Sequence, residues 1–109
     1  MTISLFLCGD VMTGRGIDQI LAHPSAPALH EIVVGSALDY VGLAEDANGP
    51  LPRRVSDTYV WGAALEELDG RKPDARIINL ETSVTTSEDA EDKGINYRMH
   101  PANVGVLSA

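Results

Sequence analysis

The 109-residue sequence has one cysteine, few aromatic residues and half as many basic as acidic side chains. A single thiol, Cys8, excludes an internal disulfide. Eight Lys and Arg against 16 Asp and Glu give a formal net charge of -8, which repels nucleic-acid phosphates and argues against nucleic acid as a partner. An anionic substrate would therefore need a local group of Arg or Lys side chains, or metal ions.

The sequence also lacks a long apolar run. The run at residues 3–8 is far shorter than the roughly 20 residues that cross a bilayer. No signal peptide is recognisable. We therefore expect the chain as given to be cytoplasmic, with any membrane association made through partners. Cys8 lies within the apolar run, so we expect a buried and unreactive thiol.

Several common active-site signatures are missing. No Gly-x-Gly-x-x-Gly or Gly-Lys-Ser/Thr follows an apolar run, which argues against a Rossmann turn or a P-loop. No Gly-x-Ser-x-Gly is present, which argues against a serine hydrolase.

The apolar pattern indicates an α/β fold. Residues 3–8 form a short, nearly continuous apolar run, typical of a strand buried on both faces of a parallel sheet, and residues 75–80 are predicted to form a second strand. Between them, helical spacing predicts a short helix at residues 16–22, one begun by Ser36, and one at residues 57–69 with Ser56 as its N-cap. The order predicts at least two parallel strands joined by crossover helices.

The last part of the chain is polar and then helical. Residues 85–93 form an acidic stretch that predicts a solvated loop, and Pro101 opens a further helix. Two parallel strands need more cover on both faces than this chain supplies. We therefore expect residues 1–109 to be the N-terminal portion of a single larger domain, truncated at its C-terminus.

Two acidic residues follow the two predicted strands. Asp10 comes after the first strand and Glu81 after the second. The carboxyl ends of parallel strands meet at one edge of a sheet, where ligands bind in open α/β folds. Paired carboxylates there would form a hard-oxygen site for a divalent cation. Each residue alone could equally be a turn former or a solvent-facing acid.

Three motifs, taken in order, favour a functional role for these two acidic residues. Residues 9–16 (Gly-Asp-Val-Met-Thr-Gly-Arg-Gly) resemble the opening motif of the CapA family, which is linked to poly-γ-glutamate capsule synthesis. Asn-Leu-Glu at residues 79–81 resembles its second motif. Lys93-Gly94, then Arg98 and Pro101, resemble its third. The resemblance spans nearly the whole chain.

The resemblance implies a metallophosphoesterase-like αββα sandwich with a two-metal site. Carried onto matching positions, it makes Asp10, Asn79 and Glu81 the catalytic metal ligands, with Asn79 either a ligand or a hydrogen-bonding neighbour. The cofactor would be divalent metal ions (Mn, Zn, Fe or Mg), which orient a water, lower its pKa and clamp the attacked group.

Two departures from the wider superfamily matter. The superfamily usually opens with Asp-x-His, but this chain has Met12 at the histidine position. A thioether is a poor ligand for hard cations. The later Asn-Asn-His and His-x-His motifs lie beyond this chain. We therefore expect little or no activity from residues 1–109 alone.

Arg15, Lys93 and Arg98 are the candidate substrate-binding residues. A guanidinium group binds a carboxylate or a phosphate through two parallel hydrogen bonds. The resemblance implies an anionic small molecule or polyglutamate as substrate, and other capsule-synthesis proteins as possible partners. The alternative is that Arg15 or Arg98 pairs with an acid of the same chain.

Two functions stay open from the sequence, beside a plain α/β domain with an unrelated role, for which Asp10→Ala would leave metal affinity unchanged. The first is a metal-dependent, phosphoesterase-like hydrolase in its full-length form. The second is a non-catalytic component that binds polymer or assembles a capsule complex. Metal dependence of binding and of phosphoester cleavage separates the two.

Overall fold

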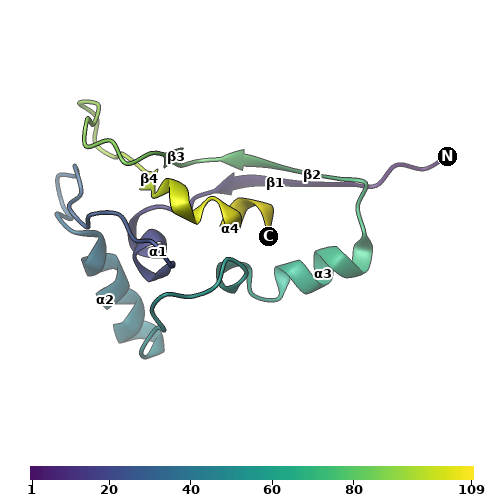
Figure 1. Cartoon of the computed structure of the whole chain (residues 1–109), viewed down its shortest axis with the longest axis horizontal. Helices are drawn as coiled ribbons and strands as arrows, with labels where there is room; N and C mark the ends of the chain where they lie inside the picture. Colours follow the sequence, from purple (N-terminus) through teal and green to yellow (C-terminus); the bar gives the residue numbers. More distant parts are fainter.

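The computed structural model describes residues 1–109 as an α/β chain with two small sheets (Figure 1). Both sheets are parallel and two-stranded, so the predicted fold class and strand direction are confirmed. The strands are β1 (Leu5–Val11), β2 (Ala75–Leu80), β3 (Ser83–Val84) and β4 (Arg98–Met99). The helices are α1 (Arg15–Ile20), α2 (Ala37–Asn48), η1 (Tyr59–Trp61), α3 (Ala64–Arg71), η2 (Pro101–Asn103) and α4 (Gly105–Ser108), η marking 3₁₀ turns.

The β1–β2 pair carries an irregularity that sets the direction of Asp10. Leu7 pairs with Ile77, but Asp10 rather than Gly9 pairs with Asn79, so β1 has one extra residue at a bulge. Because successive residues of a strand face opposite sides, that extra residue places Asp10 on the side that Asn79 faces. β1 therefore runs past the predicted end at residue 8, and Asp10 lies within the strand. The predicted bounds of β2 agree with the structure.

The first two helices follow the sequence pattern. α1 begins and ends close to the predicted residues 16–22. Ser36 is the N-cap of α2, and its Oγ accepts a hydrogen bond from the Leu38 N–H at 3.2 Å. Gly49 ends α2 with a φ of 85°, a conformation that glycine adopts without steric cost.

The prediction of a continuous helix at residues 57–69 is wrong. The chain forms a 3₁₀ turn, η1, and then α3, because Gly62 adopts a φ of 54° and interrupts the helical hydrogen bonds. The Oγ of Ser56 lies 3.1 Å from the Thr58 hydroxyl oxygen instead of capping a helix. Trp61 donates its indole N–H to the Val106 carbonyl at 2.8 Å, which ties η1 to α4. This distant contact fixes the turn where local spacing favoured a helix.

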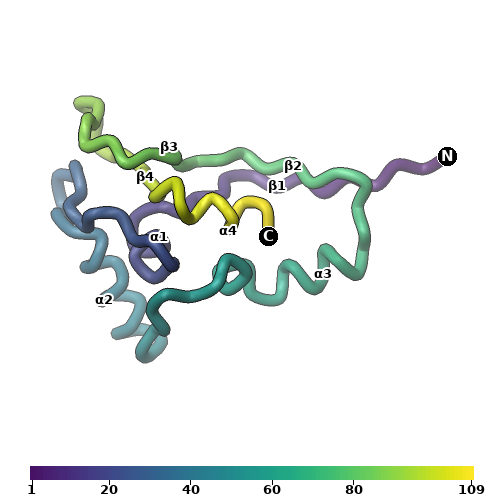
Figure 2. Tube along the Cα trace, in the orientation of Figure 1, coloured from purple at the N-terminus to yellow at the C-terminus, as the bar shows by residue number.

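The apolar core lies beside the larger sheet, at the end of the molecule where α1, α2 and β4 gather (Figure 2). Its buried members are Ile20, Leu21, Val41, Val55, Met99 and Val106. The chain is elongated, and β1 and β2 extend away from the core toward the N-terminus.

The larger sheet is therefore exposed, contrary to the prediction that its first strand is buried on both faces. Leu5, Leu7 and Ile77 each expose more than half of their surface. Cys8 is also exposed, which corrects the prediction of a buried thiol. Within these 109 residues each strand of the sheet has one neighbouring strand. None of the helices has the length and apolar character needed to cross a membrane.

A buried carboxylate connects the start of the chain to its last helical turns. Asp18 is 1% exposed, and its Oδ1 accepts from the His100 backbone N–H at 2.9 Å and from the Asn103 amide at 3.1 Å. Its Oδ2 accepts from the Ser25 N–H at 2.6 Å. Asn103 in turn exchanges two hydrogen bonds with the backbone of His23. These bonds position β4 and η2 against α1.

Candidate functional site at the carboxyl edge of the sheet

Three of the predicted site residues meet at the carboxyl edge of the β1–β2 sheet. The Asn79 side-chain nitrogen donates to Asp10 Oδ1 at 2.7 Å and to Glu81 Oε2 at 3.2 Å. Asn79 and Glu81 are two residues apart, so they face the same side of the chain. The amide therefore lies between two carboxylates that would otherwise repel each other. All three residues are exposed to solvent.

The same two segments are joined a second time, by residues that the sequence analysis did not single out. The Thr13 backbone N–H donates to Thr82 Oγ1 at 3.1 Å, and both threonines are buried. Thr13 Oγ1 has no hydrogen-bond partner in the protein. The sequence feature that could have identified them is their place in the motifs, since Thr13 lies three residues after Asp10 and Thr82 three residues after Asn79.

The first and third motifs also touch directly. A Cβ atom on Gly14 would lie 2.8 Å from the Arg98 carbonyl oxygen and 3.1 Å from its nitrogen, both main-chain atoms. Only a residue without a side chain allows this approach. The glycine of the first motif thus fixes the distance between α1 and β4.

Arg15 is held by its own chain. Its Nε donates to Glu31 Oε1 at 2.6 Å, and both side chains are largely buried. The guanidinium carbon lies 4.9 Å from the centre of the Tyr40 ring and 4.7 Å from that of Tyr97, within cation–π range. Arg15 has a φ of 50°, uncommon for a residue with a side chain.

Tyr40 completes this cluster from α2. Its hydroxyl donates to Glu31 Oε2 at 3.0 Å. Partial burial raises the pKa of Tyr40, and the hydrogen bond to Glu31 raises it further, because both favour the neutral phenol over the phenolate.

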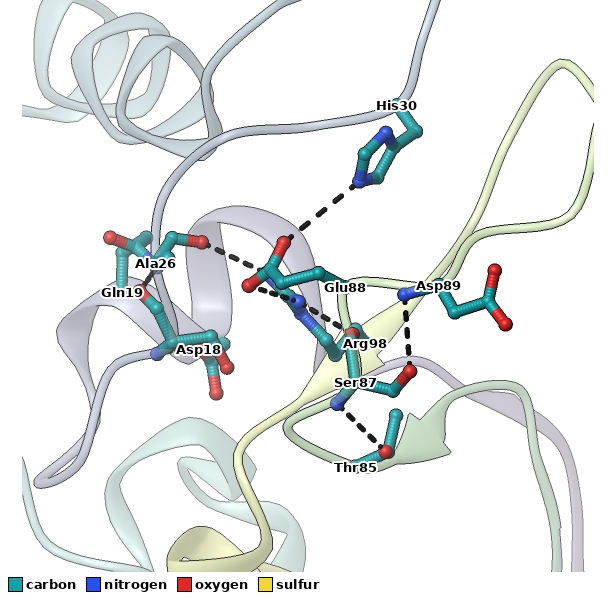
Figure 3. A network of polar contacts seen from close by, with 10 residues as sticks. Asp18, Gln19, Ala26, His30, Thr85, Ser87, Glu88, Asp89 and Arg98 are labelled. Carbon is teal, nitrogen blue, oxygen red and sulfur yellow. Dashed lines mark hydrogen bonds and ion pairs between the residues drawn. The ribbon is translucent and has the colours of Figure 1, made fainter.

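Arg98 lies at the start of β4 and is also paired. Its Nη1 is 2.8 Å from Glu88 Oε1 and donates to the Ser87 carbonyl at 2.8 Å, and its Nη2 donates to the Ala26 carbonyl at 3.2 Å (Figure 3). Lys93 lies on the exposed loop between β3 and β4. Internal ion pairs, the alternative left open by the sequence, are thus present for Arg15 and Arg98, and their substrate roles stay predictions.

The acidic edge has part of the donor set that a divalent cation needs. Two carboxylates and the Asn79 amide supply hard oxygen donors, and a cation between the carboxylates would offset their repulsion. The unpartnered hydroxyl of Thr13 lies in the same motif. No group of three or more His, Cys, Asp or Glu side chains gathers at this or any other position. The residues therefore fit part of a cation site.

These features describe an α/β protein whose polar motif residues gather at one edge of a parallel sheet. The chain belongs to the family described as bacterial capsule synthesis protein PGA_cap, whose family model matches residues 4–109. The resemblance inferred from the three motifs is confirmed.

Two curated relatives come from Mycobacterium tuberculosis, strains CDC 1551 / Oshkosh and ATCC 25618 / H37Rv, and each is named "Probable polyglutamine synthesis accessory protein". Both are 47% identical over 108 residues, which is 98% of this chain. The chain spans 28% of the length of each relative. No solved structure gives a significant match.

Proposed function

We propose that this chain supplies the first ligands of a divalent-metal site in a phosphoesterase-like hydrolase linked to capsule polyglutamate. The observation that carries the proposal is the meeting of Asp10, Asn79 and Glu81 at the carboxyl edge of parallel strands. The family's description as a capsule synthesis protein and the relatives' name, which refers to polyglutamine synthesis, support a link to the synthesis of such a polymer.

Asp10 and Glu81 would hold the cation, and Asn79 would bind it or orient the carboxylates. A bound divalent ion supplies Lewis-acid character and lowers the pKa of a coordinated water. The N–H groups of the Asn79 amide carry partial positive charge, and they lie between the two carboxylates where a cation would bind. A single larger domain, with residues 1–109 as its N-terminal portion and further ligands supplied from outside it, is part of the proposal.

The substrate is proposed to be anionic, and Arg15, Lys93 and Arg98 are proposed to bind it. Arg15 and Arg98 line one hollow, although each already has an internal acid. A charge of -8 on the chain would repel a polyanion unless such cations faced it. A cytoplasmic location and contacts with other capsule-synthesis proteins also stay predictions.

The test is metal binding by the intact protein. Manganese binding is measured by calorimetry for the parent protein and for Asp10→Ala, and hydrolysis of a generic phosphoester is followed with and without metal. We expect Asp10→Ala to weaken binding at least about tenfold, since even neighbours of metal ligands contribute that much. The control is Asp46→Ala, which removes an exposed acid of α2. Equal affinity in parent and Asp10→Ala would contradict the proposal.

The second candidate is a non-catalytic component that binds polymer or assembles a complex. The relatives' description as accessory proteins favours it. It predicts that the intact protein binds oligoglutamate equally well with and without a metal chelator, and that no phosphoester is cleaved. Metal-dependent cleavage in the parent protein, lost in Asp10→Ala, would exclude it.

A further inference from the structure

The guanidinium group of Arg98 is fixed in place by neutral main-chain atoms. Nη1 donates to the Ser87 carbonyl and Nη2 to the Ala26 carbonyl, and the side chain is 15% exposed. These carbonyls orient the group without neutralising its charge. An arginine held in this way is ready to bind a carboxylate with little loss of side-chain entropy.

The carboxylate that pairs with Arg98 comes from a solvent-exposed side chain. Glu88 Oε1 is 2.8 Å from Arg98 Nη1, while its Oε2 is 4.0 Å from His30 Nε2. Figure 3 shows this carboxylate between the guanidinium and the imidazole. Glu88 is 62% exposed and lies on the acidic loop between β3 and β4. Ion pairs with an exposed partner add little to stability, so Glu88 can be displaced at small cost.

Other acids nearby do not take this place. Asp18 lines a hollow that Arg98 and His30 also line, but its two oxygens already accept the three hydrogen bonds described above. Asp89 also lines the hollow, but it forms no ion pair with Arg98 or His30. Glu88 is thus the one acid that forms a contact with both Arg98 and His30.

Arg98 lies where two hollows adjoin. One has a cavity volume of about 90 Å³ and also includes Arg15 and His30. The other, of about 300 Å³, includes Glu88 and His100. Ser25, Ala26 and Arg98 line both. The second volume reaches the lower end of the range found for small-molecule sites, and adjoining hollows suit an extended ligand.

We propose that Arg98 and His30 form a carboxylate-binding subsite, and that Glu88 occupies it as an internal competitor when no ligand is bound. The ligand's carboxylate would displace Glu88 and take its place beside the guanidinium and imidazole. The apparent affinity for ligand is then reduced by the fraction of molecules in which Glu88 fills the subsite. That the ligand is a glutamyl polymer rests on the proposed function, whereas the subsite and its competitor rest on these contacts.

The experiment measures binding of glutarate and of oligo-γ-glutamate to the intact protein by calorimetry, in the presence of a metal chelator. The variants are Glu88→Gln and the control Asp89→Asn, which removes a neighbouring charge that does not pair with Arg98. We expect Glu88→Gln to bind both ligands about two- to fivefold more tightly, the range implied by loss of an exposed ion pair. We expect Asp89→Asn to match the parent protein.

A second variant covers the case in which changes at Arg98 disturb folding. His30→Gln removes the imidazole from an exposed loop, and we expect it to weaken glutarate binding. Unchanged affinity in Glu88→Gln, or equal gains in Glu88→Gln and Asp89→Asn, would overturn the proposal. Binding of inorganic phosphate without binding of glutarate would also overturn it. Because the chelator removes metal, these results are independent of whether the acidic edge binds a cation.

Discussion

Gly14 and Arg98 approach so closely that a Cβ atom on the glycine would lie 2.8 Å from the arginine carbonyl oxygen. The carbonyl oxygen belongs to the main chain of Arg98, so a larger residue at position 14 cannot be accommodated by a side-chain movement alone. The contact joins the loop before α1 to β4 across most of the sequence.

Gly14→Ala is therefore expected to lower the free energy of unfolding by about 1–3 kcal/mol through overpacking. Urea denaturation of the intact protein measures the change. The control is Gly42→Ala in α2, where a Cβ would meet no atom within 4 Å. That variant should be more stable by about 0.5–1 kcal/mol, because alanine favours helix. Equal effects of the two changes would show that the Gly14 contact is unimportant.

Asn79→Asp tests the electrostatics of the acidic edge. It replaces the N–H groups between Asp10 and Glu81 with a third carboxylate. Without metal, we expect a loss of about 1 kcal/mol, comparable to one net hydrogen bond plus exposed like-charge repulsion. Added Mn²⁺ should restore more stability to this variant than to the parent. Thermal unfolding with chelator and with metal provides the measurement.

A matched control adds the same charge far from the site. Thr2→Asp places a carboxylate in the exposed N-terminal segment. It should change stability little in either condition. If Mn²⁺ stabilised Thr2→Asp as much as Asn79→Asp, its action would be a general response to negative charge.

Asp18→Asn tests the buried carboxylate. An amide cannot accept all three hydrogen bonds that Asp18 accepts, so at least one buried donor loses its partner. We expect a loss of about 1–3 kcal/mol in the free energy of unfolding. Asp46→Asn, an exposed change of the same type, should stay within about 0.5 kcal/mol of the parent. Guanidinium denaturation compares them.

Tyr40 gives the stability a dependence on alkaline pH. Its pKa in the folded chain is raised above the ordinary value of 10.0, so the folded state holds the phenolic proton more tightly than the unfolded state. The resulting stability is fully present below pH 10.0 and is lost as the pH rises through the folded pKa. The advantage of the parent over Tyr40→Phe should therefore be constant at neutral pH and shrink in alkali. A difference that grew above pH 10.0 would contradict this sign.

Local patterns predicted those elements that depend on nearby residues. The strand β2 and the serine cap of α2 needed only short stretches of sequence. The break at Gly62 was missed because the Trp61 bond to Val106 joins residues 45 positions apart. The bulge in β1 was missed because nothing in residues 8–9 alone indicates which residue β2 will oppose.

Only part of the site could be predicted, because the rest depends on contacts between distant residues. Strand direction and motif order were enough to bring Asp10 close to Asn79 and Glu81. The partners of Arg15 and Arg98 could not be chosen from the sequence, because the chain has 16 acids and the choice depends on how the loops fold back. The exposure of Cys8 was not predicted, because an apolar stretch of sequence indicates burial but does not show whether another element packs over it.

The pairing of β1 with β2 has a consequence for the order of events during synthesis. Asp10 and Asn79 are 69 residues apart, and ribosomes add about 5–20 residues per second. Asp10 is thus made several seconds before the strand that holds its partner. Parallel pairing across so long a separation is also slow to form. The two halves of the acidic edge are produced at different times, so its assembly has to wait until β2 has been synthesised.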